Sequence, residues 1–281
     1  MTHVVRHASE LDRWEMVHSE PDPRLDGYVL SYCAYDERTA SFVRRRELPS
    51  DRVVAIVNLG EPIRVCTHDG GWTTQPDGFL AGLHDSYALT ETCGAQRGVQ
   101  IDLSPVGAHL LFRLPMYELA HCVVTLEDLF GRAGSHLHEA LALAGGFQER
   151  FALLDDFFLA RLDDALSPVP SITRALGRLR ATAGSVPVGA LAAEVGCSRR
   201  YLTAGFREHV GVAPKLLGRI LRFQHAIRLM DERGLGWAEI SHTCGYYDQA
   251  HLIRDFKQFA GSAPGDFARR RLPDGGGVIG D

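Results

Sequence analysis

Two segments near the C-terminal end carry side chains that can pair with DNA bases. Arginine can donate two hydrogen bonds to guanine O6 and N7, glutamine can pair with adenine N6 and N7, and threonine can contact a thymine methyl group. Spacings of three and four residues place such side chains on one face of a helix. The first segment carries Ser198, Arg199, Arg200, Thr203 and Arg207, and the second carries Asp248, Gln249, Arg254 and Lys257.

The two segments are copies of one pattern. Gly196 corresponds to Gly245 and, with one extra residue in the second turn, Phe206 corresponds to Phe256. Each copy predicts a short apolar helix, a glycine turn and a second helix that ends before Gly-x-Ala-Pro, which is typical of a helix-turn-helix. Leucine and phenylalanine at i, i+4 spacing, Leu202 with Phe206 and Leu252 with Phe256, would also suit a solvated helical repeat. The base-pairing side chains on the opposite face favour DNA binding.

The charge distribution supports the same interpretation. Residues 171–281 hold 16 Lys and Arg against 10 Asp and Glu, a net charge of +6, whereas residues 1–170 hold 14 against 25, a net charge of −11. A basic segment gains affinity for phosphates by releasing counterions, and an acidic one is repelled. The two halves therefore have different partners.

The C-terminal part resembles the AraC/XylS family of bacterial transcription regulators over roughly residues 171–271. The resemblance rests on both glycine turns, the phenylalanine in each second helix, the long linking stretch 214–230 and the Ala-Pro after each copy. It implies seven helices, with two recognition helices that enter successive major grooves on one face of DNA. By position it implies base contacts at Arg200, Thr203 and Ala204 in the first copy, and at Gln249, Ala250 and Arg254 in the second. The two alanines depart from longer polar side chains and offer a methyl contact alone.

The expected fold class is α+β. A strand-rich small barrel or sandwich with a helical end forms a regulatory or dimerisation domain over residues 1–162, because short apolar runs alternate there with turn residues. Residues 163–170, with two prolines, form a linker. An all-α DNA-binding domain with two helix-turn-helix units covers 171–271, and a disordered tail covers 272–281. Residues 1–25 are expected to be an irregular lead-in.

Within the first domain, two features allow alternative interpretations. Aromatic and histidine side chains can line a pocket for a small-molecule effector or can belong to the core: Trp72, Phe79, His84 and Tyr87. A helical stripe can cover the sheet or can pair with its twin in a dimer: Phe147, Phe151, Leu154 and Phe158. A dimer is slightly favoured, although one chain already has two helix-turn-helix units.

Other chemistry has weaker support. The six cysteines are scattered, and neither they nor the histidines (His68, His84, His109, His121, His136, His138) have zinc-ligand spacing, so we expect no metal and no cofactor. Neither a nucleophile-elbow motif nor a glycine-rich phosphate loop stands in the sequence, so we expect no enzyme. The chain shows no membrane-length apolar run and no secretory leader, which predicts a cytoplasmic protein without membrane contact.

Together these features predict a sequence-specific transcription regulator. The expected partners are double-stranded promoter DNA, a small-molecule effector of the first domain, RNA polymerase and a second copy of the chain. Two rivals are an effector-independent dimeric regulator and an enzyme or sensor with an accessory DNA-binding tail.

Overall fold

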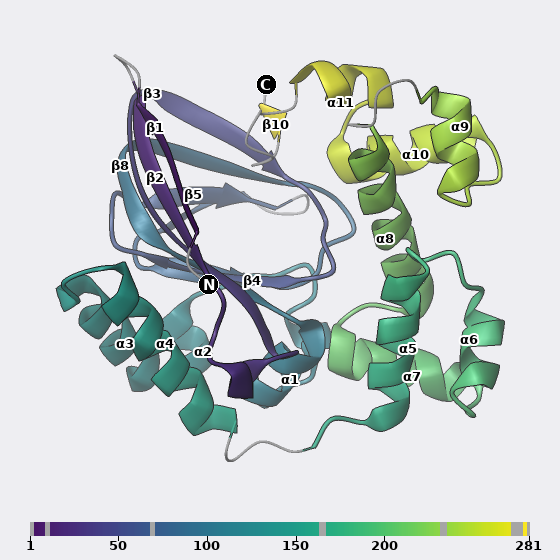
Figure 1. The fold of residues 1–281 in the computed structure, drawn as a ribbon, viewed down its shortest axis with the longest axis horizontal. Helices are drawn as coiled ribbons and strands as arrows, with labels where there is room; N and C mark the ends of the chain where they lie inside the picture. Colours follow the sequence, from purple (N-terminus) through teal and green to yellow (C-terminus); the bar gives the residue numbers. More distant parts are fainter. Residues whose placement is uncertain are drawn as a thin grey trace.

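The computed structural model describes residues 3–8, 12–67, 71–162, 167–230, 235–270 and 278–279. It consists of an N-terminal region (residues 3–162), in which helices cover one face of a bent antiparallel sheet, and a helical C-terminal region (residues 167–270) (Figure 1). The expected fold class, a strand-rich part followed by an all-helical part, is confirmed. In the described ranges no helix is long and apolar enough to cross a membrane.

The sheet of the N-terminal region is built around two long strands, β3 and β8, which pair along almost their full lengths. The path β1-β2-β3-β8-β4-β7-β9 is antiparallel throughout, β5 pairs with β6 and β8, and β10 pairs with β3. The strands are β1 His3–Ala8, β2 Asp12–Ser19, β3 Val29–Glu47, β4 Val53–Asn58, β5 Ile63–Cys66, β6 Trp72–Gln75, β7 Gly78–Ala81, β8 Ala88–Leu103, β9 Val123–Val124 and β10 Val278–Ile279.

The sheet curls because its long strands bend. The register of β3 against β8 shifts between Thr39 and Val43, and Gly94 of β8 takes a φ of +70° opposite this irregularity. An extra residue in one strand increases local twist and bends the strand. The first part of β8 therefore pairs with β5 and the last part with β4. Cys93 and Gly94, which are turn residues by type, thus lie within one bent strand.

The strand β4 shows how the sheet separates two interiors. Val53, Ala55 and Val57 are buried in the main core, whereas Val54 and Ile56 face a cavity on the other side of the sheet. Alternate residues of a strand point to opposite faces. Both faces of β4 are thus apolar, which explains its continuous apolar sequence.

The expectation of an irregular lead-in over residues 1–25 is wrong. Residues 3–8 and 12–19 of this segment form the antiparallel pair β1–β2, which adds to β3 at the edge of the sheet. The side chains of β1 and β2 are mostly exposed or half-buried, and Val17 is the residue of these two strands that lies in the main core, among those described. A pair of edge strands that buries so little does not need a clear apolar alternation, so its sequence carried a weak signal.

Helices cover the face of the sheet that lies opposite the cavity. Phe151, Leu154 and Phe158 of α4 are buried in the same core as the sheet, and Phe147 packs against it. The stripe thus covers the sheet and is not available to pair with a twin, which corrects the dimer interpretation of these four residues. The elements are η1 Pro23–Leu25, α1 Pro105–Phe112, η2 Met116–Glu118, α2 Leu126–Phe130, α3 Arg132–Leu143 and α4 Phe147–Leu162.

The C-terminal region contains two helix-turn-helix units joined by one long helix (Figure 1). The first unit is α6 with α7, the second unit is α9 with α10, and α8 runs between them. The helices are α5 Pro170–Ala181, α6 Val188–Glu194, α7 Arg199–Val210, α8 Pro214–Leu229, α9 Trp237–Thr243, α10 Gln249–Ala260 and α11 Pro264–Arg270. These seven helices agree with the number that the family resemblance implies.

The turn inside each unit has the same backbone geometry. Gly196 and Gly245 both have a φ of +72°, a left-handed conformation that glycine adopts without steric cost. Glycines with positive φ, Gly211 and Gly261, also end α7 and α10. The duplication found in the sequence is therefore a structural duplication.

The hydrophobic cores do not divide between the N-terminal and C-terminal regions. The first unit shares one continuous core with the sheet and its helices, and this core includes Met116, Leu119, Leu202 and Phe206. The second unit has a separate core, centred on Phe223, Phe256, Phe259 and Phe267.

The segments predicted as linker and tail are only partly described. Residues 163–166 of the predicted linker, and residues 272–277 and 280–281 of the predicted tail, lie outside the described residues. Val278 and Ile279 form β10, paired with Arg46 and Arg45 of β3, so the expectation of disorder is wrong for these two residues.

Candidate DNA-binding surface and pocket

Both recognition helices, α7 and α10, begin with the same kind of cap. The Ser198 hydroxyl accepts a hydrogen bond from the backbone N–H of Tyr201 at 3.1 Å, and the Asp248 carboxylate accepts one from His251 at 2.7 Å. A capping side chain satisfies one of the free N–H groups at a helix start. Other N–H groups of the first turn can bind a phosphate, to which the positive end of the helix dipole contributes. Contact of Ser198 and Asp248 with DNA remains a prediction.

The predicted polar faces of α7 and α10 are open to solvent. Leu202 and Phe206 on α7, like Leu252 and Phe256 on α10, are fully buried on the opposite faces. Thr203 is half-buried, and its hydroxyl donates to the Arg199 carbonyl at 2.8 Å, which leaves its methyl group for a base contact. The exposed members of the predicted set are Ser198, Arg199, Arg200, Ala204, Arg207, Asp248, Gln249, Ala250, Arg254 and Lys257.

Two exposed tyrosines extend this surface beyond the predicted set. Tyr247 precedes the cap of α10 and is 93% exposed, and Tyr201 in the first turn of α7 is 53% exposed. Phenolic hydroxyls are common phosphate ligands in DNA complexes. These tyrosines do not belong to the residue types that pair with bases, so they are absent from the predicted set. The sequence signal for Tyr247 is the pair Tyr246–Tyr247, of which only Tyr246 is buried.

A buried ion pair sets the position of α10 against α8. Asp255 is 1% exposed, and its Oδ1 accepts hydrogen bonds from Arg219 Nη2 at 2.6 Å and Nε at 3.2 Å. The ring of Phe223 on α8 packs against Phe256 and Phe259, with centroid distances of 4.9 and 5.2 Å. The polar and apolar contacts together hold the second recognition helix on the linking helix.

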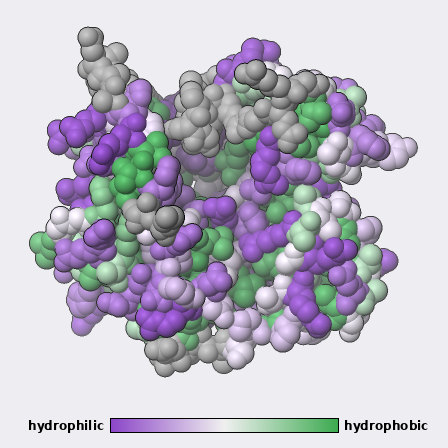
Figure 2. Space-filling view, in the orientation of Figure 1, coloured by the Kyte–Doolittle hydropathy of each residue, from purple (hydrophilic) through white to green (hydrophobic). Residues whose placement is uncertain are grey.

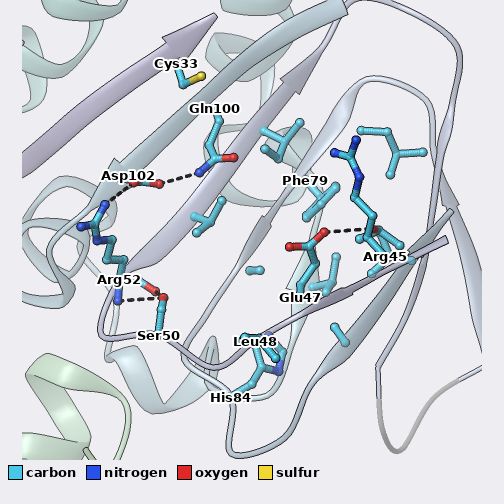
Figure 3. A pocket seen from close by; sticks show the side chains of 18 of the residues that line it. Cys33, Arg45, Glu47, Leu48, Ser50, Arg52, Phe79, His84, Gln100 and Asp102 are labelled. Carbon is cyan, nitrogen blue, oxygen red and sulfur yellow. Dashed lines mark hydrogen bonds and ion pairs between the residues drawn. The ribbon is translucent and has the colours of Figure 1, made fainter. Parts of the chain in front are cut away.

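A cavity of about 580 Å³ opens inside the curled sheet (Figure 3). Its apolar wall consists of Ile56, Ile63, Val65 and Phe79, which form a small cluster of their own. The polar part of the lining, here called the polar wall, includes Cys33, Glu37, Arg45, Glu47, Ser50, Arg52, His84, Gln96, Gln100 and Asp102. The volume is that of pockets that take small organic molecules.

Most charges in the polar wall are paired. Arg52 Nη1 lies 2.6 Å from Asp102 Oδ2, and Arg45 Nη2 lies 3.3 Å from Glu37 Oε1. Three buried atoms of lining residues nevertheless lack a hydrogen-bond partner within the described part of the chain: Arg45 Nε, His84 Nε2 and Gln96 Oε1. Unpaired buried polar groups cost free energy, which the polar groups of a ligand can recover.

Burial lowers the pKa of His84 to about 4, and the neighbouring His121 adds to this shift. The ring centroids of the two histidines are 6.1 Å apart. His84 is therefore a neutral imidazole at neutral pH, able to donate from one ring nitrogen and accept at the other.

The structure divides the four predicted pocket residues. Phe79 and His84 line the cavity, whereas Trp72 and Tyr87 do not. The side chain of Trp72 does not face the cavity, and the guanidinium groups of Arg44 and Arg64 lie 5.6 and 4.9 Å from its ring. Tyr87 packs against Arg46, with the guanidinium 4.9 Å from its ring. Residues that β3 contributes, such as Arg45, were missed because their side of the strand depends on the bend of the sheet.

The histidines singled out in the sequence do not gather at one place. His138 Nε2 lies 2.8 Å from the Asn58 carbonyl oxygen, and His136 is exposed. The rings of His109 and His209 are 4.3 Å apart, where α1 meets α7. Over the described ranges, no three His, Cys, Asp or Glu side chains are grouped so as to hold a metal ion. His68 lies outside the described residues.

The C-terminal region is similar to known helix-turn-helix proteins. Residues 191–270 match a helix-turn-helix domain family. The chain is 36% identical over 81 residues to the HTH-type transcriptional regulator GlxA of Rhizobium meliloti (strain 1021), a match that spans 29% of this chain but only 25% of that protein. The C-terminal region therefore contains a helix-turn-helix domain, in agreement with the two helix-turn-helix units expected there.

Solved structures are similar over different lengths of the chain. ToxT from Vibrio cholerae aligns with 92% of this chain and 98% of its own, with 11% identity and a TM-score of 0.45. A transcriptional regulator with an AraC-type DNA-binding domain from Chromobacterium violaceum aligns with 37% of this chain and 95% of its own, with 24% identity and a TM-score of 0.34.

Proposed function

We propose that the protein is a sequence-specific regulator of transcription that binds promoter DNA through both helix-turn-helix units. The observation that carries this proposal is the matched pair of exposed polar faces on α7 and α10, each placed by a glycine turn of the same geometry. Recognition helices read base edges in the major groove. Such a regulator acts on promoter DNA and RNA polymerase in the cytoplasm of a bacterium.

The first test is selection of binding sites from random DNA by the full-length protein at about physiological salt. The expected result is a bipartite motif whose halves lie about one helical turn apart. Arg200→Ala should degrade one position in one half, and Arg254→Ala one position in the other. Arg38→Ala, which removes an exposed arginine of β3, is the matched control and should leave the motif unchanged. Absence of an enriched motif would contradict the proposal that the protein binds specific DNA without an effector or a partner.

We also propose that the cavity of the N-terminal region binds a small-molecule effector. The cavity offers an apolar wall for the body of a ligand, and unpaired Arg45 Nε, His84 Nε2 and Gln96 Oε1 for its polar groups. An effector that binds one arrangement of the molecule better than another shifts the population toward it and so changes promoter occupancy. This feature favours an effector-controlled regulator over one whose N-terminal region only dimerises.

Native mass spectrometry of the full-length protein, exposed to bacterial small-molecule extract and desalted, tests the cavity. A bound molecule should be present with the natural chain and absent with Phe79→Trp, because the larger side chain occupies part of the cavity. Trp72→Phe, at a residue that does not face the cavity, is the control and should retain the molecule. Equal retention by Phe79→Trp would place the ligand elsewhere.

We further propose that two chains associate on DNA, although the Phe147–Phe158 stripe cannot form the contact. Sedimentation of the free protein and of its complex with the selected site would show one or two chains per duplex.

A further inference from the structure

The two units are held to the N-terminal region in different ways. The first unit shares a hydrophobic core with it, and Gly211 at the end of α7 lies against the backbone of Met116 in η2. The second unit has its own core, and Leu48 is the residue of the N-terminal region that packs against it among those described. Its position relative to the sheet therefore depends on a few further contacts.

The first of these contacts is made by Arg46. This arginine is 8% exposed, and its Nη1 donates a hydrogen bond to the Ala260 carbonyl oxygen, at the end of α10, at 3.0 Å. The guanidinium also lies over the ring of Tyr87. Gly261 ends α10 so close to the same residues that a Cβ there would lie 2.6 Å from the Tyr87 ring and 3.1 Å from Arg46 Nη1.

The second contact is made by Gln258 on the last turn of α10. Its Nε2 donates to the Asp85 carbonyl oxygen at 3.0 Å, and its Oε1 accepts from Arg219 at 2.7 Å. Arg219 is the same residue that binds the buried Asp255. Hydrogen bonds thus run from the segment 84–87 to the base of the second recognition helix.

Both contacts come from segments that also line the cavity. Arg45 and Glu47 line it on either side of Arg46, and His84 and Ser86 line it on either side of Asp85. Alternate residues of the strand β3 point to opposite faces, so Arg46 points away from the cavity that Arg45 and Glu47 line. Figure 3 shows Arg45, Glu47, Leu48 and His84 among the side chains that line the cavity. A ligand that moved Arg45 or His84 would move Arg46 and Asp85 with them.

We infer that Arg46 is a positioning residue for the second unit, and that the state of the cavity is transmitted to this unit rather than to the first. The inference rests on the proposed DNA-binding function. Two recognition helices can enter successive grooves only when their separation matches the helical repeat of DNA. A second unit fixed by Arg46 is ordered before it binds, whereas a loose one loses conformational freedom on binding.

The test measures the contribution of each half of the selected site to the affinity of the full-length protein. Dissociation constants are compared for the intact site, for a site with the α7 half scrambled and for one with the α10 half scrambled. Scrambling the α10 half raises the dissociation constant by some factor in the natural chain. In Arg46→Ala this factor should be at least tenfold smaller. The cost of scrambling the α7 half should stay within about twofold. Arg46→Lys, which keeps one donor, should restore part of the difference, and Arg38→Ala should behave as the natural chain.

Gln258→Ala provides a second variant, because Gln258 is exposed and its loss leaves both cores intact. It should weaken the contribution of the α10 half in the same direction as Arg46→Ala. Unchanged contributions of both halves in these variants would overturn the inference, and so would an equal loss in the two halves. A stronger contribution of the α10 half would also overturn it, because Arg46 would then restrain the unit from binding.

The link to the cavity is tested from inside it. Ala88 lines the cavity next to Tyr87, and Ala88→Leu adds bulk there. This variant should change the contribution of the α10 half at least threefold and leave that of the α7 half unchanged. In a chain that carries both Arg46→Ala and Gln258→Ala, the same change should have no effect, because both contacts with the second unit are then absent. A change that persists without these two contacts would contradict transmission through them. Failure of the natural chain to select any site would instead contradict the proposed function itself.

Discussion

Arg254 and Lys257 lie one turn apart on the exposed face of α10, yet we expect Arg254 to contact a base and Lys257 to contact a phosphate. Arg254 stands in the half of the helix that follows the cap at Asp248, where recognition helices contact base edges. Lys257 lies in the last turn, where a flexible ammonium suits a phosphate. Exposure alone does not separate these roles, because both residues are exposed.

Substitution of these two residues should therefore give different patterns. Arg254→Ala should cost about 1–3 kcal/mol at one base pair and relax the preference there. Lys257→Ala should weaken binding to all sequences alike and lower the slope of log affinity against log salt by about 1. Affinities for singly substituted sites at several salt concentrations distinguish the two. Uniform weakening by Arg254→Ala would make Arg254 a phosphate contact.

The residue His84 predicts a pH dependence of stability. Its pKa in the folded protein, about 4, lies below the 6.5 of an unperturbed histidine, because burial disfavours the charged form. The unfolded chain therefore binds more protons between pH 6.5 and 4, and this contribution to stability is lost as the pH falls through that window. The loss is at most about 3 kcal/mol.

Denaturant unfolding at pH 7 and pH 5 checks this expectation. The free energy of unfolding of His84→Gln should fall less between the two pH values than that of the natural chain. Substitution of the exposed His136 by Gln is the control. An identical pH dependence in all three proteins would show that His84 does not titrate in this way.

At the scale of elements, the helices were predictable to within a few residues and the sheet was not. Helix α8 and both recognition helices follow from local signals: apolar spacing of three and four residues, Pro214 at a first turn, and glycines at the ends. The long strands β3 and β8 depend on pairing with each other between residues that lie 41 (Glu47 and Ala88) to 74 (Val29 and Leu103) positions apart in the sequence. The bend at Gly94, which reads as a turn locally, becomes a bend within one strand only because β3 continues beside it.

Substitution of two glycines by alanine should change the stability of the protein in opposite directions. Gly196 has a φ of +72° and open space around it, so Gly196→Ala should destabilise the protein by roughly 1–2 kcal/mol through backbone strain alone. Gly177 lies exposed inside α5 with similar open space and without positive φ, so Gly177→Ala should stabilise it by about 0.4–1 kcal/mol. Unfolding in denaturant measures both, and destabilisation by both substitutions would contradict the expectation.

On the scale of the whole molecule, the division of the cores differs from the division suggested by the linker. The sheet, its helices and the first unit share one core, and the second unit forms another beyond α8. Contiguous cores tend to open as cooperative units. The face drawn in Figure 2 shows hydrophilic residues over both halves, with hydrophobic residues in separate patches between them.

Substitutions in each of the two cores should show whether the cores open independently. Phe206 and Phe256 are equivalent in the duplication, and both are fully buried. Truncation to alanine at either should cost about 3–5 kcal/mol in the core that contains it. By hydrogen exchange, Phe256→Ala should raise exchange in α9–α10 and spare β4, whereas Phe206→Ala should raise exchange in β4 and α7 together. Equal exchange in β4 for the two variants would show a single cooperative core.

The sequence by itself determined the duplication, the two helix-turn-helix units, the exposed residues of α7 and α10, and the apolar runs of the sheet. These features depend on interactions between neighbours in the chain, and their spacing records them directly. The tertiary structure decided which face of each strand borders the cavity, that Phe79 and His84 line it while Trp72 and Tyr87 do not, and that Arg46 reaches the end of α10. Such contacts join residues as many as 214 positions apart, so no local spacing encodes them.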